Sequence, residues 1–192
     1  MTTVHFITHP EVVIDPALPV AHWPLSAAGA RRMRLAAGRP WLAGVRSLFT
    51  STERKATDAA GLLAERLGIG PVAIEGLGEN ERSATGYLPK AEFEAVADEF
   101  FARPEQSVRG WERAANAQHR ILGAVERAMV LAAAEGDIAI VSHGGVGALL
   151  LCHLQGVPIS RDADQPGGGG GHVFSFDRAS GRLLTGWRRI EG

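Results

Sequence analysis

Short runs of consecutive apolar residues alternate along this chain with longer stretches in which apolar residues recur every three or four positions. Runs of the first kind are typical of strands buried on both faces of a parallel sheet. Four of them are predicted as strands: 4–8, 47–50, 71–77 and 137–142. The first ends abruptly at His9-Pro10 and the last at His143 and two glycines, so both strands deliver a histidine to their carboxyl ends.

The stretches with three- and four-residue spacing are predicted as helices. Ser26 is a suitable N-cap for one that ends at Gly38, and Gly68 closes a second. A long helix is predicted from about Val108 to Ala134. Other helices are predicted at 93–101 and 146–156, a terminal hairpin at 172–177 and 182–190, and a loop at the glycine run 167–171.

Strands and helices alternate throughout, without an internal repeat or an interdomain linker. This order predicts an α/β fold, a three-layer sandwich with a central, mostly parallel sheet and helices on both faces. The 192 residues fit a single domain, residues 1–192.

Composition narrows the partners of the chain. A formal net charge of −1 gives no overall basic field for nucleic acid, and no apolar stretch approaches the ~20 residues of a membrane span. The N-terminus lacks the layout of a signal peptide, and the single cysteine, Cys152, rules out an internal disulfide, so we expect a cytoplasmic protein. The scattered histidines show no metal-ligand spacing, and we expect neither a metal nor a cofactor.

In α/β sheets, ligands bind beyond the carboxyl ends of the strands. We expect His9, His143, Arg54 and Glu79 to meet there. Such a set suits phosphoryl transfer: a neutral imidazole attacks phosphorus, a carboxylic acid protonates the leaving oxygen, and the cation and second histidine neutralise charge. Helix amides after Gly144-Gly145 are expected to add to the anion site.

The order of these residues resembles the histidine phosphatase superfamily, the phosphoglycerate mutase-like group. Its pattern is Arg-His-Gly after a strand, a P-L-T-x-x-G helix entry, R-A-x-x-T-A, L-x-E, and S-H-G-G after a late strand. The matching segments are ITHP (Ile7–Pro10), PLSAAG (Pro24–Gly29), RKATDAA (Arg54–Ala60), LGE (Leu77–Glu79) and VSHGG (Val141–Gly145). The five motifs occur in the family's order over nearly the whole chain.

The resemblance implies a phosphoglycerate mutase-like fold and a metal-independent phosphatase that hydrolyses a phosphate monoester through a phosphohistidine on His9. It implies Arg54 as phosphate clamp, Glu79 as proton donor and His143 as second charge stabiliser. A mutase is less favoured. The expected partner is a small phosphorylated substrate or phosphate, and the protein is expected to be a monomer or homodimer. Other candidate substrate-binding residues are Thr8, Glu81, Arg82 and Gly144.

The chain departs from the family at its first motif, where Thr8 and Pro10 stand in place of arginine and glycine. Threonine brings no charge and no bidentate fork. Arg82 is the preferred substitute cation, with His22 and Lys55 as weaker candidates, and Glu81 is an alternative proton donor to Glu79. The alternative function is a catalytically weak or inactive phosphate-ligand binding protein. A third reading is a nucleotide-binding module that uses the 144–147 turn.

Overall fold

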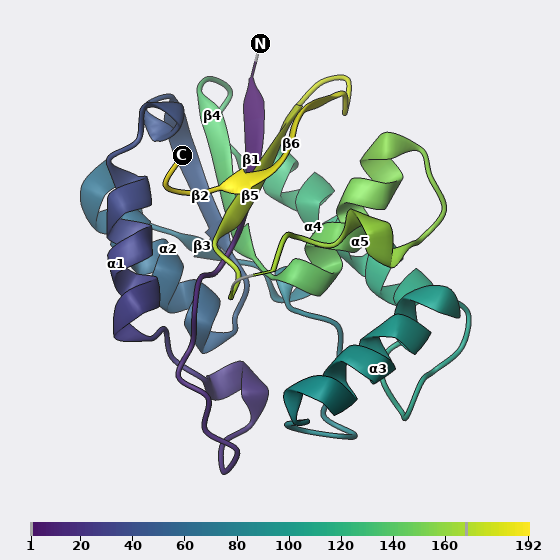
Figure 1. The fold of residues 1–192 in the computed structure, drawn as a ribbon. Helices are drawn as coiled ribbons and strands as arrows, with labels where there is room; N and C mark the ends of the chain where they lie inside the picture. The colour runs from purple at the N-terminus through teal and green to yellow at the C-terminus, as the bar shows by residue number, and fades with distance from the viewer. Residues whose placement is uncertain (1, 168) are drawn as a thin grey trace.

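The computed structural model describes residues 2–167 and 169–192, which form a six-stranded sheet with the strand order β3-β2-β4-β1-β5-β6 (Figure 1). The strands are β1 (Thr3–Thr8), β2 (Val45–Thr50), β3 (Val72–Ala73), β4 (Asp137–Ser142), β5 (His172–Asp177) and β6 (Leu183–Arg189). The first four strands in the sheet order are parallel to one another, whereas β5 is antiparallel to both of its neighbours, β1 and β6. The predicted α/β class, mostly parallel sheet and terminal hairpin are confirmed.

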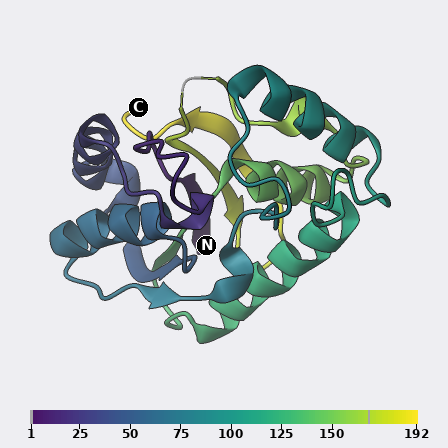
Figure 2. The ribbon, with the colours of Figure 1, turned by 90° about the horizontal axis from the view of Figure 1, so that it is seen from below.

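Helices cover both faces of this sheet. The helices are α1 (Ala27–Ala37), α2 (Arg54–Leu67), α3 (Lys90–Ala102), α4 (Ala114–Leu131) and α5 (Gly144–Gln155). Figures 1 and 2 show α1 and α2 on one side of the sheet and α4 and α5 on the other, with α3 farther out beside them. Alternate residues of β4 enter the two cores: Ile140 packs toward α4 and α5, and Val141 packs toward α1 and α2.

Local chemistry explains where the helices begin and end. The Ser26 hydroxyl accepts a hydrogen bond from the Gly29 amide and caps α1, and Gly68 ends α2 in the left-handed conformation, with φ 69°. The predicted helix 108–134 is shorter than expected and begins at Ala114. Positive φ angles at Arg109 and Gly110 break the backbone there, and the resulting turn buries Trp111.

The third predicted strand is also shorter than its apolar pattern suggested. Only Val72–Ala73 pairs with β2, and the chain then turns into a short 3₁₀ helix, η3 (Glu75–Leu77). This turn leads the chain from the edge of the sheet to Glu79. Among the described residues, no helix has the length and apolar character needed to cross a membrane.

Strand register places the two histidines at one edge of the sheet. Thr8 of β1 pairs with Ser142 of β4, so His9 and His143 follow adjacent parallel strands at the same level. The His9 amide donates to the Ser142 carbonyl over 3.1 Å. On the other side of β4, the Ser51 amide donates to the Val141 carbonyl, which brings the start of α2 to the same edge.

Candidate active site

The imidazole rings of His9 and His143 lie edge to face, with centroids 5.1 Å apart. His9 Nδ1 lies 2.8 Å from the Pro10 carbonyl oxygen, which can only accept a hydrogen bond. The proton of the neutral ring is therefore on Nδ1, and Nε2 carries the free lone pair. Burial, reinforced by His143, lowers the pKa of His9 to about 3, so the ring is neutral at ordinary pH. His9 thus has the tautomer and charge of a nucleophile.

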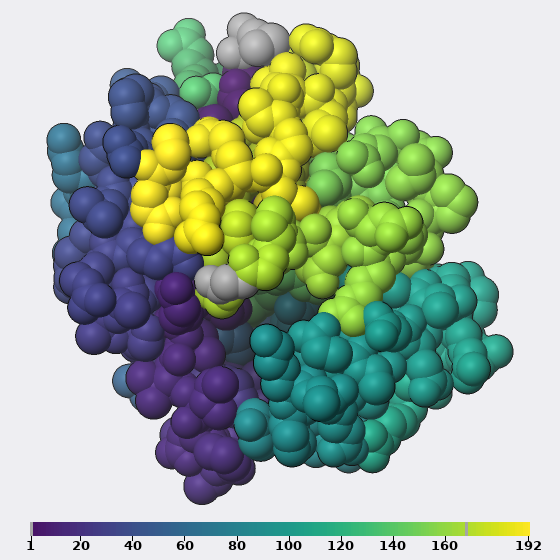
Figure 3. All heavy atoms as spheres, viewed as in Figure 1, coloured from purple at the N-terminus to yellow at the C-terminus, as the bar shows by residue number. Residues whose placement is uncertain are grey.

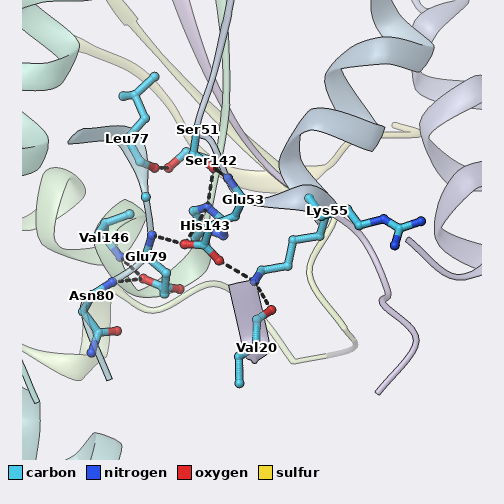
Figure 4. Close-up of polar contacts among 12 residues, drawn as sticks. Val20, Ser51, Glu53, Lys55, Leu77, Glu79, Asn80, Ser142, His143 and Val146 are labelled. Atoms are coloured by element: carbon cyan, nitrogen blue, oxygen red, sulfur yellow. Dashed lines mark hydrogen bonds and ion pairs between the residues drawn. The ribbon is translucent and has the colours of Figure 1, made fainter. Parts of the chain in front are cut away.

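His143 is fully buried between two oxygen-bearing side chains. Its Nε2 lies 2.8 Å from Ser51 Oγ and 3.4 Å from Glu53 Oε1, as Figure 4 shows for the cluster around it. Burial lowers the pKa of His143, with Lys55 and Arg82 acting in the same direction, although Glu53 and Glu79 oppose the change. Burial therefore favours the neutral ring, whereas the neighbouring carboxylates favour the protonated one.

Glu53 adds a carboxylate that the sequence pattern did not single out. Its Oε1 accepts a hydrogen bond of 2.7 Å from the Glu79 amide, and its Oε2 pairs with Lys55 Nζ. Burial opposes ionisation, but His143, Lys55 and the amide outweigh it and lower the pKa of Glu53 to about 2. A negative charge therefore lies beside both His143 and Lys55.

The structure brings Lys55 to this cluster and leaves Arg54 outside it. The Lys55 side chain is 3% exposed, and its ammonium donates to the Val20 carbonyl and to Glu53. The Arg54 side chain is 58% exposed and faces Asp58 at 3.9 Å. Consecutive helical residues point about 100° apart, so only one of the two can face the sheet edge. Arg54 is thus exposed to solvent and lies outside the buried cluster around His143.

A signal for Lys55 was present in the sequence. The arginine of the R-A-x-x-T-A motif is followed directly by alanine, and Lys55-Ala56 fits this better than Arg54-Lys55 does. The small residues of the motif face the sheet, because Ala56, Ala59 and Ala60 are all completely buried. When Ala56, Ala59 and Ala60 are aligned with the small residues of the motif, Lys55 takes the position of the motif's arginine.

Glu79 reaches the site from the loop after η3 and caps helix α5. Its two carboxylate oxygens accept hydrogen bonds from the amides of Gly145 and Val146, at 3.1 and 3.0 Å. Those amides were expected to bind the ligand anion, and Glu79 occupies them instead. Glu81, the alternative proton donor, is exposed and binds the amide and hydroxyl of Ser83.

Thr8 is buried and forms hydrogen bonds with residues near the end of the chain. Its Oγ1 lies 2.7 Å from Gln165 Oε1 and accepts from the His172 amide at 2.9 Å. The hydroxyl is therefore engaged within the protein. Sequence reasoning missed Gln165, since no local pattern marks it and its partner is 157 residues away.

A pocket of about 220 Å³ opens onto His9. Glu79, Arg82 and Gly144 also line it, which brings three more predicted site residues to His9. In Figure 3 the hollow lies where the surfaces of α3, the N-terminal loop and the segment before β5 meet. The rest of its wall includes an aromatic and aliphatic group, Phe93, Ala97, Phe100, Phe101 and Trp111, and a polar group, Asn80, Arg161, Asp164 and Gln165.

Arg82 lies across the aromatic part of this wall. Its guanidinium carbon is 4.9 Å from the Phe93 ring centroid and 5.9 Å from that of Trp111, within the range of cation–π interactions. The pocket therefore offers a cation beside flat apolar surfaces. Among residues 2–167 and 169–192, no group of three His, Cys, Asp or Glu side chains could hold a metal ion.

Comparison with solved structures shows the same fold. A mycobacterial glucosyl-3-phosphoglycerate phosphatase in complex with inorganic phosphate aligns over 100% of both chains, with a TM-score of 0.75 and 19% identity. YhfR of Bacillus stearothermophilus aligns over 96% of this chain and 95% of its own, with a TM-score of 0.79 and 22% identity. The alpha-ribazole phosphatase of Shigella flexneri aligns over 100% and 96%, with a TM-score of 0.75 and 17% identity.

No curated protein matches the chain at a significant level. The family model for the histidine phosphatase superfamily (branch 1) matches residues 20–181, a span that includes Lys55, Glu79 and His143 and leaves out Thr8 and His9. The chain therefore belongs to the histidine phosphatase superfamily.

Proposed function

We propose that the protein is a metal-independent phosphatase that hydrolyses a phosphate monoester through a phosphohistidine on His9. The observation that carries the proposal is the hydrogen bond from His9 Nδ1 to the Pro10 carbonyl, which leaves Nε2 unprotonated beside the pocket. The low pKa of His9 keeps this nitrogen nucleophilic at ordinary pH.

The chemistry proceeds in two steps. Nε2 of His9 attacks phosphorus, the bond to the ester oxygen breaks, and Glu79 gives that oxygen a proton. Water then attacks the phosphohistidine, Glu79 takes a proton from it, and phosphate leaves with His9 neutral again. The position of Glu79 supports this role, because Glu79 lines the pocket together with His9. The amides of Gly145 and Val146 fix the orientation of its carboxylate.

Lys55 takes the cationic role that the sequence assigned to Arg54. Its side chain is buried, and its charge acts on both His9 and His143. Arg82 supplies a second positive charge on the pocket wall. Together they neutralise the non-bridging oxygens of the transferring phosphoryl group.

The pocket wall favours a substrate whose alcohol is flat or apolar. Phe93, Phe100 and Trp111 line the pocket, and Arg82 can stack on a ring as it does on Phe93. A volume of about 220 Å³ suits a small ester. We expect small aryl phosphates to be hydrolysed with a lower KM than short polar alkyl phosphates.

Glu53 favours a second candidate function, the binding of a phosphate ligand with little or no catalysis. Its carboxylate pairs with Lys55 beside His143, so the buried cation is already neutralised within the protein. Such a site can hold an anion against Arg82 without stabilising the extra charge of the transition state.

Hydrolysis of an aryl phosphate in the presence of a chelator, by wild type and by His9→Gln, tests the choice. The phosphatase predicts activity in wild type, loss in the variant, and an alkali-stable, acid-labile phosphoprotein after rapid quenching. Saturable phosphate binding without turnover in wild type would favour the binding protein. Equal activity of the two proteins would contradict the phosphohistidine mechanism.

A further inference from the structure

The contact between Thr8 and Gln165 fixes the orientation of the glutamine amide. Thr8 Oγ1 already accepts a hydrogen bond from the His172 amide at 2.9 Å, and its single proton remains to be donated. The nearer acceptor is on Gln165 at 2.7 Å, whereas the His172 carbonyl is 3.4 Å away. The Gln165 atom that receives this proton is therefore the carbonyl oxygen Oε1, and Nε2 is the atom that points elsewhere.

The freed amide nitrogen of Gln165 lies against the pocket floor at Gly144. A Cβ atom built on Gly144 would be only 2.2 Å from Nε2, so a larger residue there would displace the amide from its present position. Gln165 and Gly144 line the pocket together with His9 and Glu79. Within residues 2–167 and 169–192, Nε2 donates no hydrogen bond to another protein group, so its two protons are available to a ligand.

We propose that Gln165 donates a hydrogen bond from Nε2 to a non-bridging oxygen of the phosphoryl group, and that Thr8 is the positioning residue that aims it. This inference rests on the proposed function. In the resemblance to the family's first motif, Thr8 takes the place of an arginine. Its hydroxyl positions Gln165, a residue near the other end of the chain, whose amide supplies a hydrogen-bond donor. A hydrogen bond from a neutral amide is roughly half as strong as one from a charged donor. A site that uses Gln165 in place of an arginine therefore carries less positive charge around the phosphoryl group.

Four variants test the pair. Gln165→Met keeps the length and loses both protons, and Gln165→Glu replaces the donor with an acceptor. Thr8→Val keeps the shape and loses the hydroxyl, whereas Thr8→Ser retains it. We expect Gln165→Met to lower kcat/KM for an aryl phosphate by about 100-fold and to weaken orthovanadate binding by a similar factor. Gln165→Glu should be lower still, because its carboxylate repels the phosphoryl oxygens.

In catalysis Thr8 acts through Gln165, and this can be separated from its structural contact with the His172 amide. Thr8→Val should lose about tenfold in kcat/KM, Thr8→Ser should restore most of it, and Thr8→Val should cost little further in a Gln165→Met background. Full additivity of the two losses would overturn the positioning role of Thr8. Gln165 is partly exposed, so its variants remain informative if Thr8→Val fails to fold.

The outcome for Gln165 is distinguishable from that for the proposed function. Wild-type kcat/KM and vanadate affinity in Gln165→Met, together with an inactive His9→Gln, would overturn this inference and leave the phosphatase intact. If the wild type binds phosphate without turnover, Gln165→Met should still lower the affinity for phosphate about tenfold. Wild type that neither hydrolyses esters nor binds phosphate or vanadate overturns both.

Discussion

The ammonium group of Lys55 is in contact with the carboxylate of Glu53, and the same carboxylate lies 3.4 Å from His143 Nε2. The pair is nearly enclosed, with side-chain exposures of 3% and 14%. A buried cation beside two histidines attracts phosphate, but here an internal anion competes for it. In the proposed site, the strength of phosphate binding should therefore depend on how firmly Glu53 holds Lys55.

Removing the competing carboxylate should strengthen phosphate binding. We expect Glu53→Gln to bind inorganic phosphate about tenfold more tightly, equivalent to ~1.4 kcal/mol, because Lys55 is then free to pair with the ligand. The same change should lower the free energy of unfolding by about 3 kcal/mol, since it leaves a buried ammonium unpaired. Calorimetric titration and urea unfolding measure the two effects.

The exposed Glu75 provides the control, because Glu75→Gln removes the same charge from the surface. It should leave phosphate affinity and stability almost unchanged. A weaker affinity in Glu53→Gln would mean that Glu53 helps to form the binding site rather than competing for Lys55.

Lys55 and Arg54 are adjacent in sequence, and matched substitutions should separate their roles. Lys55→Met should lower kcat/KM by about 100-fold or more, because the phosphoryl group loses its buried cation. Arg54→Met should stay within about twofold of wild type, since Arg54 makes only an exposed pair with Asp58. Steady-state kinetics with one aryl phosphate decides between them.

The double variant Glu53→Gln/Lys55→Met checks the interpretation of this loss. It removes both charges, so no carboxylate is left unpaired. If the double variant regains wild-type activity, the loss in Lys55→Met comes from the stranded Glu53 and not from the missing cation.

The proposed role of Glu79 as proton donor predicts that the effect of its removal depends on the leaving group. Glu79→Gln should lower kcat/KM by about 100-fold for an alkyl phosphate, whose alkoxide needs a proton to leave. The loss should be about tenfold or less for a nitrophenyl phosphate, whose phenolate leaves unaided. Comparing the two esters with wild type and variant gives the measurement.

Asp164 is the matched control, because it lines the same pocket. Burial raises the pKa of its carboxyl group, and Glu79 acts in the same direction. Asp164→Asn should affect both esters equally. A leaving-group dependence in Asp164→Asn that is absent from Glu79→Gln would transfer the proton-donor role to Asp164.

The buried neutral histidines should make the fold sensitive to acid. The pKa of His5 is lowered to about 4 and that of His9 to about 3, chiefly by burial, whereas unfolded histidine has a value near 6.5. Between these values the unfolded chain binds more protons, so stability is complete above about pH 6.5 and falls with decreasing pH. Each histidine should contribute a slope of up to about 1.4 kcal/mol per pH unit.

Urea unfolding at several pH values between about 7 and 4.5 measures this slope. His5→Gln replaces a titrating ring outside the pocket with a neutral side chain, and it should remove about one histidine's share of the slope. An unchanged slope would mean that His5 is not neutral in the folded protein.

The sequence by itself determined the strands and the residues at their ends. Continuous apolar runs predict buried strands because a parallel sheet is covered on both faces, and His9 and His143 follow such runs directly. The strand register then requires the two histidines to meet. Glu79 was marked by its L-x-E motif, and it also lines the pocket.

Only the tertiary structure decided which charges accompany these histidines. Arg54 and Lys55 are neighbours in the first turn of α2, and the alanine after Lys55 is the one sequence signal that favours it. The packing of Ala56 and Ala59 against the sheet fixes the helical rotation of about 100° that turns Lys55 inward and Arg54 outward. Thr8 and Gln165 are 157 residues apart, and no pattern in either segment refers to the other. Strand ends follow from local patterning, whereas side-chain partners depend on how distant segments pack.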